Sequence, residues 1–190
     1  MARGAVIDRN PSLVPVALKN PAQVAVAQPA TPLQDVGGDV NYQGVHIAIV
    51  GAERDGTITE LRPVMAGFRT GERFKLRAVS TFGGLLVIEN INPRGERRRI
   101  YPTDPGAVVV LQPGADTLIP LGKDELFEFA RYTGEEQLVI SLRDPRAIGD
   151  AASKQKVYRQ DEEYGSHFVQ EVSKGTYPAI TESIRQQHDN

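Results

Sequence analysis

The chain has 190 residues, and its 22 basic and 24 acidic side chains leave a formal net charge of −2. This balance gives no electrostatic case for binding nucleic acid. The chain contains no cysteine, which excludes disulfides, thiolate metal sites and cysteine nucleophiles and suits a protein exported from a bacterial cell.

Its 13 prolines and 18 glycines disfavour a helical protein, because both residue types interrupt helices. No stretch reaches the roughly 20 apolar residues of a membrane-spanning helix. The first residues lack the apolar core of a signal peptide. We therefore expect either a cytosolic protein or one whose Met1 begins a processed form.

Residues 1–40 form a segment rich in proline, alanine and valine, for which an extended conformation is expected. One interpretation is a flexible leader or linker. The other is an arm that adds a strand to the sheet edge of a neighbouring subunit. The second interpretation is based on apolar residues at period two, which are the candidate partner-binding residues Val14, Val16, Leu18, Val24 and Val26.

The next part of the chain, up to residue 145, carries a β pattern in which short apolar stretches alternate with Gly, Pro, Asn and Asp. This spacing is typical of an all-β protein, an antiparallel β-sandwich of immunoglobulin-like or small-barrel-like form. Asn92-Pro93-Arg94-Gly95 fits a type I turn that joins two of the strands as a hairpin. Strands are expected at 44–53, 74–79, 85–92, 97–101, 108–111, 117–120, 126–132 and 137–142.

After residue 145 the sequence becomes polar and loses sustained alternation. Short helices are expected at 146–156 and at 180–188, where Ile180 and Ile184 share a helical face. The alternative is a tail that orders only on binding. The chain thus divides into an arm at 1–40, a β-sandwich domain at 41–145 and a polar extension at 146–190.

Metal-ligand spacing is absent. His46, His167 and His188 are far apart in the sequence, so a shared site needs long-range convergence, and no metal or other cofactor is expected. His46 alternates with apolar residues and is expected to face solvent or a polar neighbour. The acidic run 161–163 lacks the spacing of a calcium loop and is interpreted as a solvated loop.

One basic cluster stands out at Arg97-Arg98-Arg99. In a strand, Arg97, Arg99 and Tyr101 lie on one face, where they could hold an anion or a glycan. The alternative is a charged edge strand that prevents edge-to-edge pairing. No nucleophile elbow, phosphate loop or dinucleotide fingerprint occurs, so no enzymatic activity is expected.

Residues 71–145 contain, in order, GERFKLRAVST, FGGLLVIENINPRGERRRIYPTD, LQPGADTLIPL and LFEFARYTGEEQLVISLRDPR. These stretches resemble the opening strand, central hairpin, middle element and closing strand pair of the bacterial domain of unknown function 4384 family. One departure is Leu85, which follows Gly83-Gly84 where an aromatic residue is expected. The resemblance implies an all-β accessory domain of exported or envelope proteins, or of kinase-like or protease-like partners, with no catalytic residue.

These patterns predict a non-enzymatic interaction or assembly module that binds another protein or copies of itself through sheet edges and terminal extensions. A homo-oligomer or filament is a possible form, and no nucleic acid partner is expected. The expected location is periplasmic or extracellular, with the cytoplasm as the alternative. A glycan- or anion-binding module and an accessory or regulatory domain of a larger envelope protein are the alternative functions.

Overall fold

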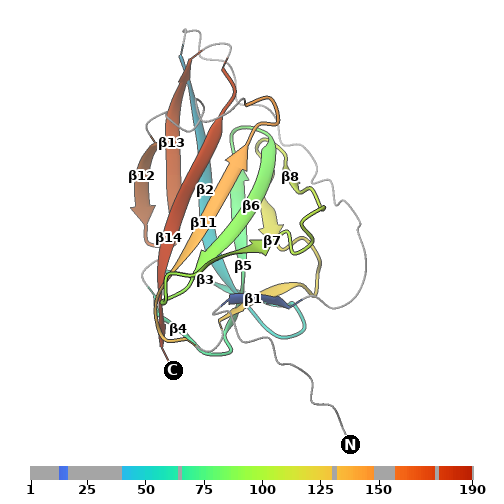
Figure 1. The fold of residues 1–190 in the computed structure, drawn as a ribbon, viewed down its shortest axis with the longest axis vertical. Helices are drawn as coiled ribbons and strands as arrows, with labels where there is room; N and C mark the ends of the chain where they lie inside the picture. The colour runs from blue at the N-terminus through green and yellow to red at the C-terminus, as the bar shows by residue number, and fades with distance from the viewer. Residues whose placement is uncertain are drawn as a thin grey trace, which may run out of the picture.

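The structure is a computed structural model, shown in Figure 1. It describes residues 13–16, 40–63, 66–129, 132–147, 157–173 and 176–189. Every regular element in these ranges is a β-strand, which confirms the all-β class. Among the described residues there is no helix of the length and apolar character that crossing a membrane requires.

The strands form two sheets with a sandwich-like arrangement (Figure 1). The first sheet has the order β1 (Leu13–Val16), β10 (Leu126–Phe129), β5 (Arg73–Ser80), β2 (Val40–Ala52), β13 (Gly165–Ser173) and β12 (Val157–Glu162), with β3 (Ile58–Arg62) beside β2 and β9 (Thr117–Ile119) beside β5. The second has the order β4 (Phe68–Arg69), β14 (Ala179–Asp189), β11 (Gly134–Arg143), β6 (Gly84–Ile91) and β7 (Arg97–Tyr101), with β8 (Val110–Leu111) beside β6. Among the strands of the described ranges, only the β14–β4 pairing is parallel.

The core lies between the two sheets and is built by alternation along the strands. In β6 every second residue is buried, as a strand with one face on the core requires. Phe127 and Phe129 of β10 are both fully buried, while Glu128 between them is half-buried. The ring of Phe129 stacks on Phe68 of the second sheet at a centroid distance of 4.3 Å, so aromatic packing joins the two sheets.

The strands expected between residues 44 and 142 are confirmed in the described part of the chain, and so is the central hairpin. Of the strand expected at 126–132, residues 126–129 form β10, and residues 130 and 131 lie outside the described residues. β6 and β7 pair antiparallel, and the Gly95 amide donates to the Asn92 carbonyl at 2.8 Å. Gly95 has a φ of 80°, a conformation that glycine adopts without steric cost. The Asn92 side chain accepts hydrogen bonds from the Arg94 and Glu96 amides, and these two bonds stabilise the turn.

The C-terminal part differs from the expected helices. Residues 180–188 lie in strand β14, which pairs with β11 along all ten residues of that strand. Ile180 and Ile184 are four residues apart, so they share a face in a strand as well as in a helix, and both are buried. β13 and β14 occupy interior positions in the two sheets. The described part of 146–156, Arg146 and Ala147, lies in a turn rather than a helix, and the remainder of that range lies outside the described residues.

The N-terminal segment contributes one strand to the described structure. β1 pairs antiparallel with β10 of the same chain, with Val14 opposite Glu128 and Val16 opposite Leu126. It forms one edge of the first sheet, where it lies across the lower end of the molecule in Figure 1. Leu18, Val24 and Val26, the other members of the expected apolar stripe, lie outside the described residues.

Candidate functional site

Two histidines that are far apart in the sequence meet on the outer face of the first sheet. The register of β2 against β13 places His46 directly opposite His167, with ring centroids 4.3 Å apart. Glu162 ends β12, and its Oε1 lies 3.3 Å from Nε2 of His167. One ligand atom from each of the three side chains lies within 4.8 Å of the others. We call His46, Glu162 and His167 the outer-face cluster.

Strand alternation explains why these side chains point outward. Val45 and Ile47 on either side of His46 are buried in the core, as is Phe168 next to His167. Because successive side chains point to opposite faces of a sheet, both imidazoles lie on the solvent side. This confirms the expectation that His46 faces solvent or a polar neighbour.

Gly165 allows the imidazole of His46 to lie close to the backbone of the β12–β13 hairpin. A Cβ atom at Gly165 would stand 2.2 Å from Nε2 of His46. No side chain fits at that distance unless the ring moves. The glycine therefore leaves open the space that the ring of His46 occupies.

Burial and the neighbouring His167 lower the pKa of His46 below its ordinary value of 6.5, and Glu162 acts in the opposite direction. Arg77, on the adjacent strand β5, also lowers this pKa. The Arg77 guanidinium is itself paired, because Nε donates to both carboxylate oxygens of Asp116 at 2.8 and 2.9 Å. The hydrogen bond from Arg77 is the main cause that holds the pKa of Asp116 below its usual range.

A second polar cluster includes His188 of the C-terminal strand β14 and is mostly buried. His188 and Glu136 are both 0% exposed, with Nδ1 and Oε1 3.3 Å apart. The Asn90 side-chain amide donates to the other Glu136 oxygen at 2.9 Å. On its far side, Nε2 of His188 lies 3.1 Å from Oγ1 of Thr70, which is an exposed residue. We call Thr70, Asn90, Glu136 and His188 the buried histidine network.

The hydroxyl, imidazole and carboxylate of this network stand in the order of a nucleophilic triad, and acyl transfer also needs hydrogen-bond donors that are directed at the oxyanion. The backbone amides of Thr70 and Gly71 donate to the carbonyls of Asp189 and Phe129, at 3.1 and 2.8 Å. Neither amide is therefore directed at a substrate oxyanion. The network links His188 of β14 to Glu136 of β11 and, through Glu136, to Asn90 of β6.

Burial lowers the pKa of His188 below 6.5, while a backbone hydrogen bond with Tyr132 and the charges of Asp189 and Glu72 oppose this shift. The ring also packs 5.4 Å from the ring of Phe129. These surroundings favour a neutral imidazole, with one nitrogen donating and the other accepting.

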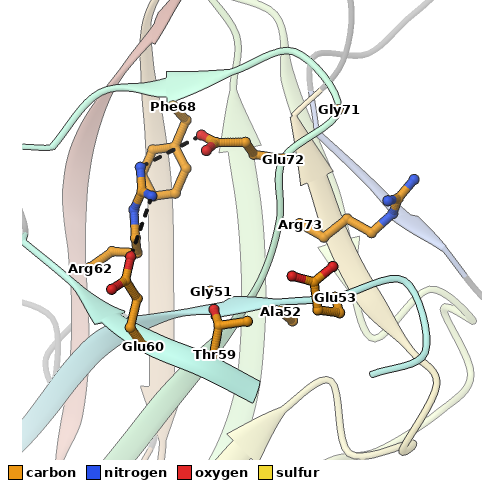
Figure 2. A pocket seen from close by; sticks show the side chains of 10 residues that line it. All are labelled: Gly51, Ala52, Glu53, Thr59, Glu60, Arg62, Phe68, Gly71, Glu72 and Arg73. Atoms are coloured by element: carbon orange, nitrogen blue, oxygen red, sulfur yellow. Dashed lines mark ion pairs between the residues drawn. The ribbon is translucent and has the colours of Figure 1, made fainter. Parts of the chain in front are cut away.

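An open cavity of about 370 Å³ lies at the end of the first sheet. Its lining comprises Gly51, Ala52, Glu53, Thr59, Glu60, Arg62, Phe68, Gly71, Glu72 and Arg73 (Figure 2). Arg62 lies between Glu60 and Glu72, at 4.0 and 3.6 Å, with its guanidinium over the Phe68 ring. Arg73 pairs with Glu128 at 2.7 Å. Both cations are already neutralised, so the cavity is a poor site for an anion.

The structure separates the three residues expected to bind an anion or a glycan. Between Tyr101 and Arg99 the β6–β7 register shifts by one residue, which places an irregularity at Ile100. As a result Tyr101 faces the core, 6% exposed, and its hydroxyl accepts a hydrogen bond from the Leu121 amide. Arg97 and Arg99 remain exposed, and Arg97 pairs with Glu89 at 2.5 Å. The expected common face therefore does not form.

The outer-face cluster was not expected from the sequence, because it depends on how β2, β12 and β13 pair. The local pattern did place His46 on an outward position, but nothing in the spacing of the histidines relates residue 46 to residue 167. The acidic run 161–163 was interpreted as a solvated loop, whereas Asp161 and Glu162 end strand β12. Comparison of the chain with protein-family models, with curated proteins and with solved structures gives no match.

Proposed function

We propose that the chain is a non-enzymatic interaction module of the β-sandwich type, which binds another protein or a second copy of itself by strand addition at a sheet edge. The observation that supports this best is the pairing of β1 with β10. A short strand from a distant part of the sequence completes that edge, so the edge accepts an added strand. Main-chain hydrogen bonds supply affinity in this binding mode, and alternate side chains supply specificity.

The sequence of β1 suits an edge strand. It reads LVPV, apolar throughout, and Pro15 has no backbone N–H to offer a further strand. Proline within a sheet is confined to edges and bulges for this reason. β1 therefore completes the edge and also limits further growth of the sheet beyond it.

The connection between β1 and β2 is long enough for an exchange between copies. Residues 17–39 separate the two strands. A connection of this length spans as much as roughly 75 Å when extended. The same strand can thus reach β10 of its own chain or β10 of a neighbour, which is the geometry of domain swapping.

The alternative of an anion- or glycan-binding module has less support, because Tyr101 faces the core and Arg97 is paired with Glu89. The proposal includes a periplasmic or extracellular location, which a chain without cysteine suits.

Cross-linking tests the strand addition directly, because the natural chain has no cysteine to interfere. Val14 and Glu128 are register partners. Directly opposite residues of an antiparallel pair lie about 4.5–5.5 Å apart, which a disulfide can bridge. We expect the Val14→Cys/Glu128→Cys variant to form a disulfide, and a non-reducing gel distinguishes a monomer from a dimer or ladder.

The matched control is Val24→Cys/Glu128→Cys, which keeps one thiol in the arm but moves it ten positions along the sequence. Cross-linked dimers in the first variant and not in the control support assembly between copies. A monomeric cross-link whose yield falls when an excess of a peptide of residues 11–18 is added before oxidation supports binding of a strand from another protein. A monomeric cross-link whose yield this peptide does not change counts against the proposed function.

A further inference from the structure

We infer that the outer-face cluster, His46, Glu162 and His167, is a binding site for one divalent transition-metal ion, of which Zn²⁺ is the representative. This site is independent of strand addition at β10, because it lies across β2, β13 and β12, toward the opposite edge of the first sheet from β1 and β10. Two imidazoles and a carboxylate are a donor set that Zn²⁺ and neighbouring first-row divalent ions bind in proteins.

The distances between the donors are close to those that one ion requires. Two atoms about 2.1 Å from an ion, at a tetrahedral angle, lie roughly 3.4 Å apart. Nε2 of His167 and Oε1 of Glu162 are already 3.3 Å apart. The full set lies within 4.8 Å, so the remaining closure is of the order of an ångström and needs only side-chain rotation.

The backbone holds the three donors in place from three different strands. His46 and His167 are opposite each other in the β2–β13 ladder, and Glu162 pairs with Gly165 at the end of the β12–β13 hairpin. Donors held by paired strands need little reorganisation to bind. The His167 side chain is 38% exposed and that of Glu162 is 55% exposed, so an ion can enter and water can complete its coordination.

The ring of His46 is available for such a role. It contacts the His167 ring, but among the described residues it makes no hydrogen bond that would occupy its nitrogens. Gly165 gives that ring room, because a Cβ there would lie 2.2 Å from Nε2. Gly165 is therefore a positioning residue for the site, while the three side chains are the ligands.

A bound ion would have a structural consequence for the sheet edge. Among the described strands β12 pairs only with β13, so it is held from one side. An ion held by Glu162 and His46 would join β12 to β2 across β13. Because the ion binds the folded state and not the dispersed donors of the unfolded chain, Zn²⁺ should raise the melting temperature.

Isothermal titration of the full chain with ZnCl₂ alone, in a buffer that does not chelate metal, tests the assignment. We expect one ion per chain, and a loss of affinity of about tenfold or more in His46→Gln and in Glu162→Gln. The matched control is Glu171→Gln, which removes an exposed carboxylate from the same strand β13 and should bind like the wild type. No binding by the wild type, or equal affinity in wild type and in either ligand variant, overturns the proposal.

Gly165→Ala provides a test that keeps all three ligands. Its Cβ should displace the His46 ring and weaken Zn²⁺ binding by about tenfold, while circular dichroism shows an unchanged fold. If this variant bound Zn²⁺ with unchanged affinity, His46 would not be a ligand, and the assignment of three donors would be wrong. As a second readout, Zn²⁺ should raise the melting temperature of the wild type and not that of Glu162→Gln, and an equal rise in both contradicts the site.

Discussion

The outer-face cluster and the buried histidine network use the same side chain in opposite ways. His46 and His167 stand on the solvent side of a sheet, next to each other and to one carboxylate. His188 is enclosed, with a carboxylate near one ring nitrogen and a hydroxyl near the other. An imidazole whose two nitrogens have protein partners contributes to stability, whereas one with open nitrogens can bind a ligand. The contrast teaches that burial and pairing decide the role of each histidine here.

The largest expected effect comes from breaking the buried network. His188→Ala leaves the fully buried Glu136 without its imidazole partner and opens a cavity beside Phe129. Leaving a buried group without a hydrogen-bond partner costs about 1–3 kcal/mol, and more when the group is charged, because it stays desolvated, and the cavity adds to this cost. We expect a total loss of about 3 kcal/mol, since Asn90 still donates to Glu136.

Urea unfolding of the wild type and of His188→Ala measures this difference. His46→Ala is the matched control, and on an outer sheet face it should change the free energy of unfolding by about 0.5 kcal/mol or less. If both variants lost the same free energy of unfolding, the claim that His188 stabilises the fold and His46 does not would be wrong.

The free energy of unfolding is expected to depend on pH through His188. The pKa of His188 lies below 6.5 in the folded protein, chiefly because of burial, so the folded state binds fewer protons than the unfolded chain as the pH falls through that region. The stability contributed by the neutral imidazole is therefore present above about pH 6.5 and is lost as the pH falls below it. A backbone hydrogen bond with Tyr132 and the charges of Asp189 and Glu72 reduce this lowering of the pKa and do not reverse it. The carboxylate of Glu136 also faces the ring.

The free energy of unfolding, measured between pH 8 and pH 5, checks this sign. The wild type should lose stability toward pH 5, and His188→Gln, which cannot titrate at this position, should lose less over the same interval. A steeper loss in His188→Gln than in the wild type contradicts the assignment of the slope to His188.

The smallest expected effect is at the ion pair beside the outer-face cluster. Arg77 and Asp116 are each nearly half exposed, so solvent screens their attraction. Exposed pairs contribute at most about 1 kcal/mol, and Arg77→Ala should lower stability by no more than about 0.5 kcal/mol. Denaturant midpoints at low and at high salt measure this change in stability. A loss as large as that of His188→Ala would contradict the prediction that the exposed ion pair contributes little to the free energy of unfolding.

The strands from residue 44 to residue 142 could be predicted because their signals are local. Alternation showed that Phe127 and Phe129 face one side, and Asn92 to Gly95 carried the chemistry of a turn. The strand β14 could not be recognised in this way. Ile180 and Ile184 fit both periods, and the partners that select the strand lie in β11, about 40 residues earlier.

The candidate sites also could not be predicted from local sequence signals. Arg97, Arg99 and Tyr101 alternate in the sequence, but the register shift at Ile100 turns Tyr101 into the core. No composition or spacing signal marks such an irregularity in advance. His46 and His167 are brought together only by the pairing of β2 with β13, two strands that are separated by most of the chain.

By itself the sequence determined the all-β class, the central hairpin and the direction of side chains such as His46, Phe127 and Phe129, since these depend on neighbours along the chain. The tertiary structure decided which strands lie side by side, and with that the outer-face cluster, the buried histidine network and the edge that β1 completes. The physical reason is that a strand satisfies its backbone hydrogen bonds with a partner that can lie anywhere in the sequence. A site that spans several strands is therefore defined by the pairing and not by the spacing of its residues.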